Sequence, residues 1–294
     1  STGNQYSPRA GAPAMLRVGT DIFVAAASHA VNGTVDLFKL NGSDFSLVSG
    51  PVPVVSSTTS WSVCNSPQVI YGKQVARPML ASNGTTLAVS AITGSQQNPQ
   101  ATCCSSDTHT LRSAFGLIST SFGPVTTGTL ASSTISGCTD LTNSAGGTTG
   151  NRTIRPAMAW NPTTSTWIAT WWDNVGVGTP PWTLKFSTVN PDGGINGARP
   201  VFNITPNEAR ASFNLSDPNN NAPSHVAVGS RSVLFVWVND LMAPLNNTTH
   251  IRWMTYDTAL TAPSLPMPAM WGFNSQTTPA NGRRPRLDAA TFDG

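Results

Sequence analysis

The stretch "RPAMAWNPTTSTWIATWWD", residues 155–173, decides the fold and holds four of the nine tryptophans. An Asn-Pro turn signal at Asn161 separates two short runs of apolar and β-branched residues, which predicts a β-hairpin. Three positions of its second run are apolar in related stretches elsewhere in the chain, where they are Phe23, Ala25 and Ala27 or Leu234, Val236 and Val238. We therefore predict that Ile168, Thr170 and Trp172 pack between sheets and do not stack on a sugar.

Similar hairpins recur along the chain, each anchored by a proline in its first run. The anchoring residues are Pro13, Pro78, Pro156, Pro223 and Pro285. Two further apolar runs follow in each complete unit, which gives four short strands per unit. Tandem units of four antiparallel strands are typical of a β-propeller, whereas a β-sandwich needs about seven strands per unit. The sequence thus predicts an all-β propeller with blades at about 9–62, 76–137, 152–206, 222–266 and 283–294, the last incomplete.

The incomplete fifth unit leaves the predicted ring open after its first strand. Two explanations remain. Either residues 1–294 belong to a longer polypeptide with six or more blades, or the terminal strand pairs with another chain, because an open sheet edge accepts an added strand. In both cases the chain is expected to form one propeller or part of one.

Charged residues make up only 10% of the chain, against an average of about 25%. The net charge of +3 comes without a basic run, so nucleic acid is not an expected partner. N-linked glycans would supply the missing surface polarity, and eight asparagines match the acceptor pattern. They are Asn32, Asn41, Asn83, Asn151, Asn203, Asn214, Asn246 and Asn247.

Cellular location follows from the same features. No run of about 18 apolar residues is present, so no membrane span is expected. The chain is expected to be secreted or exposed at the cell surface, with covalent glycans attached.

The four cysteines are expected to form disulfides that staple long loops, because an even number accompanies many glycan acceptors. Adjacent cysteines rarely bridge, so each of Cys103 and Cys104 would bond to either Cys64 or Cys138. A zinc site made of all four thiolates is the competing interpretation, but no C-x2-C pair is present. The histidines also lack metal-ligand spacing, so neither a metal nor a cofactor is expected; they are His29, His109, His225 and His250.

The chain resembles extracellular β-propellers of the sialidase-like kind in the regular recurrence of its four-strand units and in the Arg-Pro of its inner strands. The Asp-box of sialidases, Ser-x-Asp-x-Gly-x-x-Trp, is absent from every unit. The resemblance therefore implies the propeller architecture and not the sialidase activity.

Three arginines are candidate ligand-binding residues because they occupy equivalent places in their units. Arg77, Arg155 and Arg284 each precede the anchoring proline of a predicted inner strand, and inner strands surround the central channel of a propeller. Guanidinium groups gathered at one rim would bind a carboxylated or sulfated sugar.

Counting back from Trp160 opposite Trp167 places Arg155 beside Trp172 and Asp173, which predicts an ion pair between Arg155 and Asp173. The competing interpretation is that Arg-Pro begins the strand, with proline fixing φ at the first residue.

Paired catalytic carboxylates are not evident, since Glu208 is the single glutamate and the twelve aspartates lie mostly in predicted turns or at strand ends. Glycoside hydrolysis usually needs two carboxyl groups that face one bond. We therefore predict a non-catalytic structural glycoprotein that assembles with itself or with other subunits into an extracellular fibre, coat or wall. A lectin-like propeller that binds an acidic glycan through its arginines is the alternative. A third hypothesis is a glycoside hydrolase or sialidase-like enzyme whose catalytic residues lie outside this segment.

Overall fold

The computed structural model describes most of the strands and about half of their connections. The described residues are 13–27, 33–56, 61–63, 70–72, 74–96, 108–136, 152–174, 182–201, 224–241, 248–263 and 269–273. Side chains are described for a smaller set. Every helix or strand element within these ranges is a β-strand.

Sixteen of the eighteen strands form four sheets of four strands each, which we call blades 1 to 4. Blade 1 contains β1 (Ala14–Val18), β2 (Asp21–Ala27), β3 (Thr34–Asn41) and β4 (Leu47–Ser56). Blade 2 contains β7 (Gln74–Ser82), β8 (Thr86–Gln96), β9 (Thr108–Ser119) and β10 (Thr126–Ser136). Blade 3 contains β11 (Arg152–Asn161), β12 (Thr166–Asn174), β13 (Trp182–Val189) and β14 (Arg199–Pro200). Blade 4 contains β15 (Ser224–Val228), β16 (Ser232–Leu241), β17 (Thr248–Asp257) and β18 (Ala269–Phe273).

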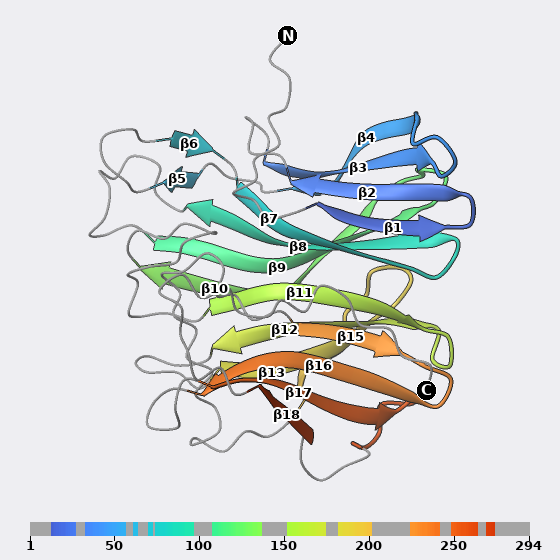
Figure 1. Ribbon diagram of the computed structural model, residues 1–294. Helices are drawn as coiled ribbons and strands as arrows, with labels where there is room; N and C mark the ends of the chain where they lie inside the picture. The colour runs from blue at the N-terminus through green and yellow to red at the C-terminus, as the bar shows by residue number, and fades with distance from the viewer. Residues whose placement is uncertain are drawn as a thin grey trace.

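Each blade is an antiparallel meander whose strands lie side by side in chain order. The first strands of successive blades contact one another, from β1 to β7, to β11 and to β15, and the four sheets stack face to face (Figure 1). This is how propeller blades are arranged. The predicted all-β fold with four-stranded antiparallel units is confirmed. A short ribbon of β5 (Trp61–Val63) and β6 (Ile70–Gly72) lies in the chain between blades 1 and 2. All four cysteines lie outside the described residues, so the disulfides stay a prediction.

The core consists of three apolar layers, one between each pair of neighbouring blades. Because successive side chains of a strand point to opposite faces, the second strand of a blade contributes to two layers. In β12, Trp167, Ala169 and Trp171 pack toward blade 2, while Ile168 packs toward blade 4. Trp167 is 0% exposed and Trp171 is 1% exposed. Trp167 and Trp171 therefore fill the space between blades 2 and 3. Of the three positions predicted to pack between sheets, Ile168 and Thr170 are buried, and the side chain of Trp172 is outside the described set.

Hydrogen bonds join blades 3 and 4 across their apolar layer. The Tyr256 hydroxyl donates to the Val201 carbonyl at 2.7 Å, and its ring packs edge-on against Phe186 and Phe235. Burial raises the pKa of Tyr256, and the nearby Arg199 charge opposes that rise. The tyrosine therefore stays a protonated donor throughout the neutral range.

Blades 1 and 2 approach so closely that one strand position has no room for a side chain. A Cβ atom on Gly116 would lie 2.4 Å from the carbonyl oxygen of Val54. Gly116 lies in the middle of β9 and Val54 in β4, so the outer strand of blade 1 rests on the backbone of blade 2. Glycine is required here for close approach and not for turn conformation.

Replacing Gly116 by alanine should lower the free energy of unfolding by about 1 to 3 kcal/mol, because the backbone of one blade must move. Gly197→Ala is the matched control, since nothing lies within 4 Å of its Cβ position. Urea denaturation followed by tryptophan fluorescence measures both variants. Equal stability of the two variants would contradict the close approach of β4 and β9.

Tyr256→Phe should lower the free energy of unfolding by about 1 to 2 kcal/mol at neutral pH, because the hydrogen bond to Val201 is lost. The cost should shrink as the pH rises above about 10. In that range Tyr256 ionises in the unfolded wild-type protein but stays protonated in the folded protein. The free energy of unfolding of the wild type therefore falls with pH, whereas phenylalanine has no proton to lose. Denaturation of both proteins at several alkaline pH values tests this, and a stability gap that widens would contradict it.

Candidate functional site

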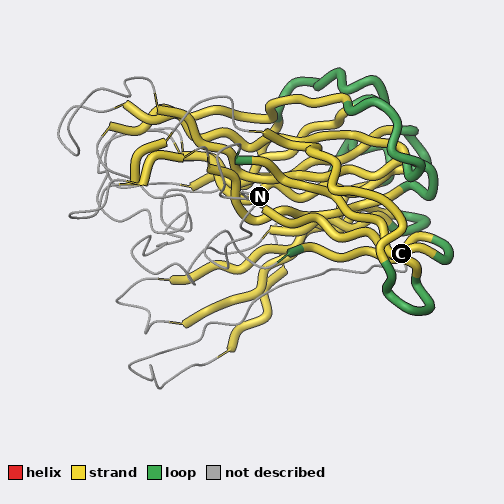
Figure 2. Tube along the Cα trace, turned by 90° about the horizontal axis from the view of Figure 1, so that it is seen from above, coloured by secondary structure: helices red, strands yellow, loops and turns green. Residues whose placement is uncertain are grey.

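The two ends of the blades differ in what the described residues contain. At one end, which we call the turn end, short turns join the first strand of each blade to the second, and described connections join the third strand to the fourth in blades 1 to 3; Figure 2 shows these turns gathered on one side. The other end, which we call the site end, is where β1, β7, β11 and β15 begin and where β2, β8, β12 and β16 end. The predicted ligand-binding residues within the described strands belong to the site end.

Arg77 and Arg155 each lie in a β-bulge, close to the site end of their strands. In β7, Ala76 pairs with Ile92 and Met79 pairs with Ser90. Two residues, Arg77 and Pro78, therefore face one residue of β8.

The same irregularity occurs in β11, where Ile154 pairs with Trp172 and Ala157 pairs with Thr170, so that Arg155 and Pro156 form the bulge. Both prolines are buried. Proline fits a bulge because it has no N–H to donate to the ladder.

These bulges correct two sequence-based interpretations. Trp160 pairs with Trp167 as predicted, but Trp172 pairs with Ile154 and not with Arg155, and Asp173 pairs with Thr153, because the bulge inserts one residue between the turn and the strand end. Arg-Pro also does not begin the strand, since β11 starts at Arg152. The side chains of Arg155 and Asp173 are outside the described set, so their ion pair stays a prediction. Arg284 lies outside the described residues altogether.

Aspartates from three blades occupy the site end. Asp173 is the penultimate residue of β12, and Asp240 is the penultimate residue of β16. Asp36 is the third residue of β3 and is 2% exposed. Sequence reasoning missed Asp36 and Asp240. The signal for Asp36 was a carboxylate inside the apolar run "VDLF", where burial is costly unless the charge has a role or a partner.

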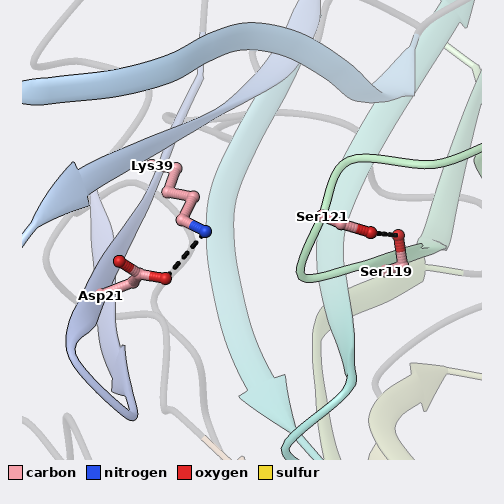
Figure 3. A network of polar contacts seen from close by, with 4 residues as sticks. All are labelled: Asp21, Lys39, Ser119 and Ser121. Atoms are coloured by element: carbon pink, nitrogen blue, oxygen red, sulfur yellow. Dashed lines mark hydrogen bonds and ion pairs between the residues drawn. The ribbon is translucent and has the colours of Figure 1, made fainter.

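Carboxylates at the turn end serve local structure. Asp21 forms an ion pair with Lys39 at 2.7 Å, and Ser119 and Ser121 share a hydrogen bond at 3.1 Å in a neighbouring turn (Figure 3). The Ser46 backbone N–H lowers the pKa of Asp44, and the Ser46 hydroxyl adds to this effect.

Asp257 behaves in the same way. Its hydrogen bonds from the hydroxyl and the backbone N–H of Thr261 lower its pKa. The turn-end carboxylates thus hold their turns.

Two of the predicted glycan acceptors are described, and both lie at the turn end. The Asn41 Oδ1 atom accepts hydrogen bonds from the Ser43 backbone N–H at 2.9 Å and from its hydroxyl at 2.7 Å. Asn83 accepts the equivalent pair from Thr85 at 3.0 and 3.1 Å. Glycosylation stays a prediction for these two. The other six acceptors, Asn32, Asn151, Asn203, Asn214, Asn246 and Asn247, lie outside the described residues.

Within the described ranges, no group of three histidine, cysteine or acidic residues is arranged to hold a metal ion. The described part of the chain also contains no helix with the length and hydrophobicity needed to cross a membrane.

Comparison with known proteins relates the chain to solved structures only. No protein-family model matches it, and no curated protein matches it. A thermostable family-43 glycoside hydrolase aligns with 90% of this chain and 71% of its own, at a TM-score of 0.45 and 11% identity. An exo-1,5-α-L-arabinanase from a bovine ruminal metagenomic library aligns with 83% of this chain and 69% of its own, at a TM-score of 0.40 and 11% identity. The native Bacillus subtilis arabinanase aligns with 83% of this chain and 70% of its own, at a TM-score of 0.40 and 12% identity.

These comparisons contradict two of our predictions. The solved structures that the chain resembles are glycoside hydrolases, so a non-catalytic structural glycoprotein is the wrong expectation, and so is the expectation that the chain is not an enzyme. Since the TM-scores are below 0.5, the activities of these enzymes are not transferred to this chain.

Proposed function

We propose that this chain is a carbohydrate-active β-propeller that hydrolyses glycosidic bonds in acidic glycans, at the site end of blades 1 to 4. One observation carries the proposal. The topology collects arginines and aspartates from different blades at one end of the sheets, while the described carboxylates of the opposite end hold their own turns.

The arginines define the chemical class of the substrate. Arg77 and Arg155 occupy matching bulges in β7 and β11, and these two strands contact each other. A guanidinium group binds a carboxylate through two parallel hydrogen bonds. Two such groups on adjacent inner strands favour a sugar that carries a carboxylate, namely a uronic acid.

The aspartates provide the chemistry of hydrolysis. Cleavage uses one carboxyl group that protonates the leaving oxygen and a second that activates water or attacks the sugar. Asp173 and Asp240 are our candidates for this pair, because they end the second strands of adjacent blades. Asp36 is the third acidic residue of the site end and is buried. We assign it an electrostatic role in the site rather than a direct role in cleavage.

We propose that the protein is secreted and glycosylated, with Asn41 and Asn83 as acceptors at the turn end. Their place on the turns keeps glycans attached there away from the site end. This arrangement is compatible with access of a polymeric substrate to the site.

The direct test is to incubate the full chain with polygalacturonate, arabinan and xylan and to measure the release of reducing ends. We expect cleavage of polygalacturonate, with kcat lowered at least 100-fold by Asp173→Asn and by Asp240→Asn. Asp192→Asn is the matched control. Asp192 accepts a hydrogen bond from the Gly194 N–H in an exposed turn, which asparagine can also accept.

Two outcomes would count against the proposal in different ways. Cleavage of arabinan or xylan without cleavage of polygalacturonate would retain the hydrolase and reject the role of the arginines. Absence of cleavage with all three polysaccharides, in a protein that is folded by circular dichroism, would reject the hydrolase.

A further inference from the structure

We infer that Ser90 of blade 2 is a positioning residue for Arg155 of blade 3. This inference rests on the proposed function for its substrate, but its structural basis is independent of the reaction. The Ser90 hydroxyl donates a hydrogen bond of 2.7 Å to the carbonyl oxygen of Pro156, the residue that forms the bulge together with Arg155.

The location of this bond makes it well suited to hold the bulge. Ser90 is 1% exposed, and Pro156 is also buried, so water does not compete for the interaction. A bulge interrupts the regular ladder and leaves a residue without its strand partner. The Ser90 hydroxyl satisfies the Pro156 carbonyl from the neighbouring blade, and it thereby fixes the backbone beside Arg155.

The hydroxyl group at the corresponding position of blade 3 donates within its own blade instead. Thr170 in β12 corresponds to Ser90 in β8, because each pairs with the residue that follows the bulge proline. The Thr170 hydroxyl donates to the Lys185 carbonyl of its own blade at 2.9 Å. Pro223, the residue of blade 4 that corresponds to Pro156, lies outside the described residues.

The described residues of β2 provide no equivalent hydrogen bond to the bulge that carries Arg77. The residues of β2 that pack toward blade 2 are Phe23, Ala25 and Ala27, and none of them has a hydroxyl group. Of the two described arginine bulges, the one with Arg155 is therefore bonded both to its own blade, through the pairing of β11 with β12, and to blade 2, through Ser90. We infer that Arg155 sets the position of the substrate carboxylate more strictly than Arg77 does.

A double-mutant cycle tests this inference. The probe is trigalacturonic acid, titrated by tryptophan fluorescence against the full chain. Ser90→Ala should weaken binding about tenfold, Arg155→Ala should weaken it at least as much, and the double variant should bind like Arg155→Ala alone. Ser90→Thr, which retains the donor, should bind within about threefold of the wild type.

A control separates positioning from general loss of stability. The Ser187 hydroxyl is also buried and donates to a carbonyl, that of Asn196, but it lies toward the turn end of β13. Ser187→Ala should destabilise the fold to an extent similar to Ser90→Ala and leave binding unchanged. Additive effects of Ser90→Ala and Arg155→Ala, or equal loss of binding in Ser187→Ala, would overturn the inference.

A second measurement keeps the inference testable if the proposed substrate is wrong. The Nε–H resonance of Arg155 can be followed by ¹⁵N NMR without any ligand. Ser90→Ala should shift or broaden it, while Ser187→Ala should leave it in place. An unchanged resonance in Ser90→Ala would refute the positioning role, whereas failure of the wild type to bind trigalacturonic acid would refute only the substrate.

Discussion

Packing of a blade on both of its faces, as in blades 2 and 3, is the constraint on which the rest of the structure depends. A sheet with two buried faces needs apolar residues at consecutive positions, and β12 provides them with Trp167, Ile168, Ala169 and Trp171. Among the described residues, the indole N–H groups of Trp167 and Trp171 have no hydrogen-bond acceptor, although both rings are fully buried. An unpaired N–H costs about 1 to 3 kcal/mol, while the loss of a buried tryptophan costs about 3 to 5. Apolar packing therefore outweighs the polar penalty, and this explains why so many tryptophans occur in one strand.

The same packing determines where polar groups are tolerated. Between blades, two buried hydroxyl groups satisfy a backbone carbonyl of the neighbouring blade: Tyr256 donates to Val201, and Ser90 donates to Pro156. Each of these bonds links two blades at a defined position along their strands. The blades are consequently fixed against sliding, which apolar contacts alone do not ensure because they are not directional.

Local sequence patterns were sufficient to predict four antiparallel strands per blade and the register next to the turn of the β11–β12 hairpin. Trp160 pairs with Trp167 because the Asn-Pro turn fixes the first pair of the hairpin. Prediction failed beyond Pro156, because counting residues from a turn assumes an unbroken ladder and a bulge violates this assumption. An Arg-Pro inside a strand is itself the signal for a bulge, since proline cannot donate to the ladder. Asp36 and Asp240 were missed because no motif marks them, and only the antiparallel topology brings them to the same end as Arg155.

The division between the two ends of the blades follows from how the chain is connected. Short turns need carboxylates and amides that accept the hydrogen bonds of their own backbone, and Asp44, Asp257, Asn41 and Asn83 are engaged in this way. At the site end, the strand termini belong to segments far apart in the sequence, so residues placed there meet groups from other blades. A bulge held by the neighbouring blade makes the position of Arg155 depend on the contact between blades 2 and 3. The geometry of the site is in this way a property of the assembled propeller, and a single blade does not contain it.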